Sequence, residues 1–225
     1  MTPIDRKKYM DAREVRQLRT FAEHWSLKDL QAGRVMGVIS WVVVDTAMAT
    51  GLRVSELAAL KVGDFDAKRG ALTIMRLKRK KRAPESLALG RELVQHLVDF
   101  IAWKADADQP TGRADALFRG KRGPLTAQGL AQLWKASVRR AGLPRELSIH
   151  SARHTLAVHL LQKTRNLRQV QKQLGHASPA TTANLYADVP FEDMQAGVTG
   201  LYDEGEPADG QTAVKKSAGS QPELA

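Results

Sequence analysis

The chain contains no cysteine. It therefore has no thiol nucleophile, no structural disulfide and no cysteine-based zinc finger. Aromatic residues make up only 5% of the sequence, which favours binding to a duplex backbone over binding to single strands through stacked bases. The sequence has no run of about 18 apolar residues, so it predicts no membrane-spanning helix. The most apolar stretch, residues 35–44, is followed at once by Asp45, so we interpret it as part of a buried core helix.

Positive charge is abundant. The chain carries 35 lysines and arginines against 24 acidic residues, a formal net charge of +11. This excess indicates a polyanionic partner, most simply nucleic acid, although a basic protein with a solvated surface has the same composition. The N-terminal residues include no apolar signal core, so we expect a cytoplasmic, nucleoid-associated protein without a membrane partner.

Helical spacing dominates the first 201 residues of the 225-residue chain. Asp11 and Glu14 form a capping-box pattern, and Gly51 is placed to end a long apolar helix in a left-handed turn. Ser178 and Pro179 are typical of a helix start. The predicted helices cover residues 11–25, 30–50, 54–60, 90–105, 126–142, 150–162, 167–174, a segment that carries residues 181–186, and residues 191–201.

Two short strands, residues 71–75 and 86–89, interrupt the helices. They flank a tip, residues 78–82, in which every residue is lysine or arginine. Such a tip suits contact with DNA phosphates, but it is also typical of a solvated hairpin end. From Asp203 onward the composition predicts a disordered tail. The expected fold class is therefore mainly α with a small antiparallel β-sheet.

Five residues in short, distinctive segments carry the candidate chemistry: Arg53, His150, Arg153, His176 and Tyr186. His150 and Arg153 are three residues apart on a predicted helix, so both project from one face, beside a helix N-terminus that favours an anion. An arginine fork can hold two phosphate oxygens at once, which lysine cannot do. A tyrosine attacking phosphorus, with cations holding the growing negative charge, is the side-chain set needed to break a phosphodiester without metal.

Each residue alone has an ordinary structural interpretation. A single arginine is most often in a surface ion pair, and His150 alone fits a helix-start histidine. His176 fits a helix C-cap, and Tyr186 fits a half-buried aromatic residue on a helix. Together they form a far more specific pattern than any one of them.

With these segments in this order, the chain resembles the tyrosine recombinases, the phage integrase family. The matching stretches are Thr-Gly-Leu-Arg53-Val-Ser-Glu56-Leu, His150-x-x-Arg153-His-Thr, and Leu-Gly-His176 followed by Thr-Thr and Tyr186. The resemblance runs from about residue 11 to residue 201. It implies a tyrosine recombinase catalytic-domain fold over residues 11–202, with residues 1–10 as an extension and residues 203–225 as the tail.

The resemblance also implies the reaction and the role of each residue. Tyr186 would attack the scissile phosphate and form a 3′-phosphotyrosyl bond, with no metal, ATP or other cofactor. Arg53, Arg153 and His176 would bind the phosphate oxygens, and His150 would help to accept the tyrosine proton. Glu56 would orient Arg53. Lys78 would protonate the leaving 5′ oxygen, with Lys80 and Lys81 as competitors; Arg79, Lys80, Lys81 and Arg82 are the expected DNA-binding residues.

The layout is shorter than usual for the family. About ten residues precede the first predicted helix, so we expect a catalytic domain without the N-terminal core-binding domain, similar in layout to the short recombinases that invert fimbrial promoters. The expected partners are double-stranded DNA, three further copies in a homo-tetramer on paired sites, and an accessory DNA-binding protein. The alternatives are a non-catalytic DNA-binding regulator on the same fold and a type IB topoisomerase-like activity.

Overall fold

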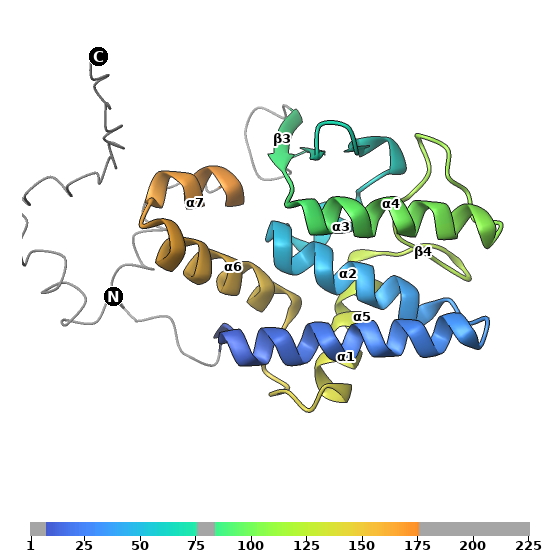
Figure 1. Cartoon of the computed structure of the whole chain (residues 1–225), viewed down its shortest axis with the longest axis horizontal. Coiled ribbons are helices and arrows are strands. Elements are labelled where there is room, and N and C mark those ends of the chain that lie inside the picture. The colour runs from blue at the N-terminus through green and yellow to red at the C-terminus, as the bar shows by residue number, and fades with distance from the viewer. Residues whose placement is uncertain (1–7, 76–83, 176–225) are drawn as a thin grey trace, which may run out of the picture. The chain divides into compact units, whose positions relative to one another are not determined.

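Helices form most of the residues that this computed structural model describes, which are 8–75 and 84–175. All of them lie in one unit of the chain, residues 1–188. In chain order the elements are α1 (Ala12–Gln31), α2 (Met36–Thr50), α3 (Val54–Ala58), the short 3₁₀ turn η2 (Val62–Asp64), β1 (Phe65–Asp66), β2 (Ala71–Met75), β3 (Pro84–Ala88), α4 (Arg91–Asp106), β4 (Arg119–Gly120), β5 (Gly123–Pro124), α5 (Ala127–Arg140), α6 (Ile149–Thr164) and α7 (Leu167–Leu174) (Figure 1).

Helix α1 begins as predicted and ends later than predicted. Asp11 and Glu14 close the capping box, but the helix continues through Gln31 instead of ending near Trp25, and α2 begins at Met36 instead of near Leu30. The polar residues that suggested a loop include Asp29, which is buried on α1. Its carboxylate accepts hydrogen bonds from the Arg34 Nε at 2.8 Å and from the Gly37 amide at 2.7 Å. A buried carboxylate thus closes the α1–α2 corner.

Helix α2 is the buried core helix that its composition predicted. Most of its residues are buried, and α1 and α4 flank it (Figure 1). Asp45 is also buried there and bonds both neighbouring helices: Arg19 Nη2 of α1 lies 2.7 Å from one carboxylate oxygen, and His96 Nδ1 of α4 lies 2.6 Å from the other. The polar residue that ends the apolar run therefore ties three helices together.

Two small antiparallel sheets complete the fold. The pairing of β2 with β3 matches the predicted hairpin, with Leu72 opposite Leu87, although β3 begins at Pro84, two residues before the predicted start. Strand β1 pairs with the other edge of β2, and β4 pairs with β5. These last three strands have two residues each, too few for a periodic pattern. The basic tip lies outside the described residues.

Helices α6 and α7 have a small hydrophobic core of their own, beside the main one. Ala157 and Leu161 of α6 pack with Val170 and Leu174 of α7. Helix α7 has the bounds predicted for it, and Figure 1 shows it lying next to α6. No helix in the described part of the chain is long and apolar enough to cross a membrane.

Candidate functional site

Arg53 lies in the turn between α2 and α3, and its guanidinium is held by Glu56 in the first turn of α3. Gly51 ends α2 in the left-handed conformation at φ 62°, as predicted. Arg53 is the N-cap of α3: its amide donates to Glu56 Oε2 at 2.8 Å, and its Nη1 donates to Glu56 Oε1 at 2.9 Å. The Glu56 side chain is 1% exposed and that of Arg53 is 23% exposed. A buried carboxylate therefore holds both the main chain and the side chain of a partly accessible arginine.

Arg153, on α6, is more deeply buried and joins three separate segments. It is 8% exposed. Its Nη1 donates to the Gly51 carbonyl at 2.8 Å and its Nη2 donates to the Leu174 carbonyl at 2.6 Å. One guanidinium therefore links α6, the turn that precedes Arg53, and the end of α7. Because the group is planar, two bonds to fixed carbonyl groups also fix its plane.

Gly51 is packed so closely that a side chain there would force its neighbours to move. A Cβ atom placed there would lie 2.6 Å from Leu174 Cδ2 and 3.0 Å from Leu156 Cδ2. The sequence identified Gly51 as a helix terminator only. The close approach to α6 and α7, and the use of its carbonyl by Arg153, have no signal in a single sequence.

His150 is the second residue of α6, three residues before Arg153, and is exposed. The amide groups of the first turn of a helix lack partners inside the helix, and the helix dipole adds positive potential there. An exposed imidazole beside such a helix start is in a suitable place to meet an anionic group.

His154 follows Arg153 and is half-buried. The pKa of the His154 imidazole is lowered from its ordinary value, first by burial and then by the positive charges of Arg153, His150 and Lys8. Cations of the segment before α1 and of α6 therefore act on the same ring.

The other predicted site residues lie outside the described residues: Lys78, Arg79, Lys80, Lys81, Arg82, His176 and Tyr186. The described chain ends just before one of them, since α7 ends at Leu174 and Gly175 caps it in the left-handed conformation at φ 62°. His176 is the next residue in the sequence. Of the predicted set the structure describes Arg53, Glu56, His150 and Arg153. Arg53 bonds Glu56, Arg153 bonds the Gly51 carbonyl two residues before Arg53, and His150 lies three residues before Arg153 on α6.

Comparison with known proteins gives a consistent result. Residues 8–193 match the family model described as the phage integrase family. The tyrosine recombinase XerD of Oceanobacillus iheyensis is 33% identical over 158 residues, which cover 69% of this chain and 52% of that protein. The tyrosine recombinase XerC of Herpetosiphon aurantiacus is 36% identical over 149 residues, or 65% of this chain and 47% of that one. The chain thus spans about half the length of these relatives.

Solved structures agree on the fold. The XerA recombinase has a TM-score of 0.67 at 23% identity, over 85% of this chain and 62% of that one. The XerH site-specific recombinase bound to its difH substrate, in a pre-cleavage complex, has a TM-score of 0.65 at 25% identity, over 85% of this chain and 52% of that one. The expected fold class, mainly α with a small antiparallel sheet, is therefore confirmed.

Proposed function

Because this chain belongs to the phage integrase family, we propose that it is a site-specific DNA recombinase that cleaves and rejoins duplex DNA through a 3′-phosphotyrosyl intermediate. The chain spans about half the length of the curated relatives that it matches, so the activity is proposed for this chain itself. The XerH relative is a recombinase described in complex with DNA, which supports DNA as the partner here.

The observation that carries the proposal is the fixed pair of arginines. Arg153 is held by the Gly51 and Leu174 carbonyls, and Arg53, two residues after Gly51, is held by Glu56. The transition state of phosphoryl transfer gathers negative charge on the phosphate oxygens, and catalysis depends on cations placed before the reaction begins. Donors fixed by carbonyl and carboxylate groups need little reorganisation when that charge develops.

Four further residues would complete the reaction. The Tyr186 hydroxyl has an ordinary pKa of about 10, so it needs a base or a positive field to attack at neutral pH. Its oxygen would form a bond to phosphorus while the bond from phosphorus to the 5′ oxygen breaks, and Lys78 would give that oxygen a proton. His150 would help to accept the tyrosine proton, and His176 would donate a hydrogen bond to the phosphate. Rejoining reverses these steps without ATP.

The proposal includes an assembly. A homo-tetramer on paired sites would exchange the cleaved strands, and Arg79, Lys80, Lys81 and Arg82 would contact the DNA backbone. An accessory DNA-binding protein would add affinity, and the complex would be located on the nucleoid. The catalytic domain would cover residues 11–202, bounds that stay a prediction because the described residues end at Gly175.

Covalent capture tests the proposal directly. The protein is incubated with sheared host DNA and denatured in SDS, and DNA that remains attached to protein is sequenced. The chain has three tyrosines, so Tyr186→Phe is compared with Tyr9→Phe and Tyr202→Phe, which make the same chemical change elsewhere. We expect adducts from the wild type and from both control variants, at a common sequence, and none from Tyr186→Phe.

Other outcomes identify other functions. DNA binding without any adduct above the Tyr186→Phe level would contradict the proposal and favour a non-catalytic regulator on the same fold. Adducts without strand exchange between two copies of the recovered sequence would favour a topoisomerase-like activity.

A further inference from the structure

Thr155 is a buried hydroxyl residue on α6, two residues after Arg153, with both hydrogen-bonding roles in use. It is 1% exposed. Its Oγ1 donates to the Ser151 carbonyl one turn earlier at 2.7 Å, and the same oxygen accepts from the Met10 amide at 2.9 Å. Ser151 lies between His150 and Arg153 in the first turns of α6. One hydroxyl therefore connects those turns to a residue 145 positions away in the sequence.

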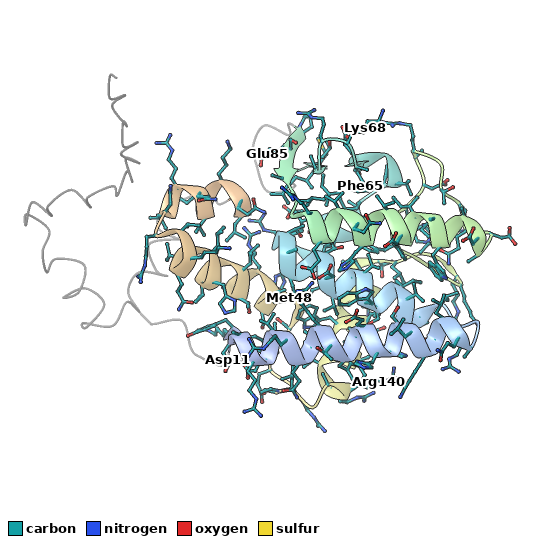
Figure 2. All side chains as sticks on the ribbon, viewed as in Figure 1. Asp11, Met48, Phe65, Lys68, Glu85 and Arg140 are labelled. Atoms are coloured by element: carbon teal, nitrogen blue, oxygen red, sulfur yellow. The ribbon has the colours of Figure 1, made fainter. Side chains whose placement is uncertain are left out.

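Met10 is itself fixed in place. Its side chain is fully buried, and the next residue, Asp11, caps α1. Figure 2 shows Asp11 at the end of α1 that faces α6. The Met10 amide is therefore attached to a helix that packs along α2, and α2 leads into the turn that carries Gly51 and Arg53.

Arg153 and Thr155 hold α6 from opposite sides. Successive residues of an α-helix are rotated by about 100°, so two residues apart are separated by about 200° around the axis. Arg153 bonds the Gly51 and Leu174 carbonyls on one side, and Thr155 bonds the Met10 amide on the other. These hydrogen bonds on both sides, added to the packing of α6 against α2 and α7, resist rotation of the helix about its axis.

We propose that Thr155 is a positioning residue, which uses the Met10 amide to set the rotation of the first turns of α6 and thereby to aim His150 and Arg153 at the scissile phosphate. Thr155 acts through α6 and does not touch the DNA. The expected effect of Thr155 on the reaction rate rests on the proposed recombinase function. Its expected effect on the orientation of α6 rests on the described contacts alone.

Thr155→Val is the informative variant because valine has nearly the shape of threonine without the hydroxyl. It leaves the buried Met10 amide without its acceptor and removes the hydrogen bond that opposes Arg153 on the other side of α6. A displacement of about 1 Å at a catalytic group can cost about 100-fold in rate. We therefore expect covalent-adduct formation at saturating DNA to fall about 10- to 100-fold, with the Kd for DNA changed less than about twofold, because the phosphate-binding cations remain.

Two matched variants separate positioning from general stability. Thr155→Ser keeps the hydroxyl and should restore most of the rate. Ser137→Ala removes a hydroxyl of the same kind elsewhere: Ser137 Oγ donates to the Leu133 carbonyl one turn earlier at 3.1 Å and bonds Ser40 of α2 at 2.7 Å. Ser137→Ala should lower stability but leave the rate within about twofold of the wild type. A slow Thr155→Ser, or equal losses of rate in Thr155→Val and Ser137→Ala, would overturn the proposal.

A measurement that needs no activity distinguishes failure of this inference from failure of the proposed function. NMR signals of the His150 and His154 rings report the orientation of α6 in the full chain without DNA. Both should shift in Thr155→Val and return toward their wild-type positions in Thr155→Ser. In the wild type, the Met10 amide should exchange with deuterium far more slowly than that of the exposed Lys8. Unchanged ring signals, or fast exchange at Met10, would contradict the positioning role even in a chain that forms no adducts.

Discussion

The guanidinium of Arg153 donates a 2.8 Å hydrogen bond to the main-chain carbonyl of Gly51, 102 residues earlier in the sequence. Gly51 is at the same time the left-handed C-cap of α2 and a contact point for Leu156 and Leu174. The residue that ends α2 thus also anchors the buried guanidinium of Arg153 through its carbonyl. Arg53 follows two residues later in the chain. Helix termination, packing and the anchoring of Arg153 therefore all involve Gly51.

The first prediction is that Gly51→Ala destabilises the protein more than its backbone conformation alone explains. The left-handed conformation costs a residue with a Cβ about 1–2 kcal/mol. At Gly51 the new methyl group would also lie 2.6 Å from Leu174 Cδ2, and overpacking of this kind costs about 1–3 kcal/mol more. Urea unfolding of the two proteins measures the difference.

Gly33→Ala is the matched control for this prediction. Gly33 also has a left-handed φ, 64°, but nothing lies within 4 Å of a Cβ built there. The unfolding free energy of Gly33→Ala should therefore fall only by the conformational cost of about 1–2 kcal/mol. Equal losses of unfolding free energy for Gly33→Ala and Gly51→Ala would show that the close approach to Leu174 and Leu156 is not a tight contact.

The second prediction concerns Arg153→Lys, which keeps the charge and removes the planar fork. Lysine cannot bond the Gly51 and Leu174 carbonyls in the same geometry, so one buried acceptor loses its donor and the unfolding free energy should fall by about 1–3 kcal/mol. On the proposed function, adduct formation should fall about 100-fold or more. Arg139→Lys, an exposed position on α5, is the control and should change neither quantity. Activity equal to that of the wild type in Arg153→Lys would mean that charge alone suffices.

Predictions from the sequence were most accurate where a local signal acts on the backbone. The capping box at Asp11 and Glu14, the glycine after Thr50 and the buried run of α2 each gave a correct helix terminus or helix. The end of α1 was wrong because Ser26 and Asp29 are polar, and polarity indicated a loop. Both are buried, and Asp29 bonds the corner that follows. Only the three-dimensional partner of a polar residue distinguishes these cases.

The site shows the same limit. The motif singled out Arg53 and Arg153, and the resemblance to the family implied the contact between Arg53 and Glu56. Nothing in one sequence indicates that Arg153 bonds the carbonyls of Gly51 and Leu174, because every residue has a carbonyl. Likewise, no pattern in the sequence indicates the hydrogen bond between the Met10 amide and Thr155. Long-range partners of the main chain follow from the packing of helices, which the fold determines as a whole.

The third prediction concerns Lys104, a fully buried lysine on α4. Its Nζ donates to the Ala116 and Leu117 carbonyls at 3.0 Å, which holds the loop before β4. Burial, aided by the charge of Arg119, lowers the pKa of the Lys104 ammonium from its ordinary 10.5. Because the unfolded chain keeps its proton up to a higher pH than the folded one, stability gained from this group rises as pH rises toward 10.5.

Lys104→Met removes this pH dependence. The unfolding free energy of the wild type, minus that of Lys104→Met, should increase between neutral pH and pH 10, measured by urea unfolding at each pH. Lys135→Met, at an exposed position on α5, shows the effect of removing a lysine from the surface. A difference that stays flat across this range would mean that the buried amine binds its proton as tightly in the folded chain as in the unfolded one.

The fourth prediction concerns His154 at acid pH. Burial and the charges of Arg153, His150 and Lys8 lower the pKa of its imidazole below the ordinary 6.5. Between the folded pKa and pH 6.5 the unfolded chain binds the proton and the folded chain does not, so stability falls as pH falls through this window. His154→Gln cannot take up the proton, and its unfolding free energy should therefore fall less than that of the wild type between pH 7 and pH 5. His24→Gln, at an exposed position on α1, is the control for the removal of an imidazole from the surface. If His154→Gln loses as much stability as the wild type on acidification, then burial and the neighbouring positive charges together do not lower the pKa of the His154 imidazole in the folded chain.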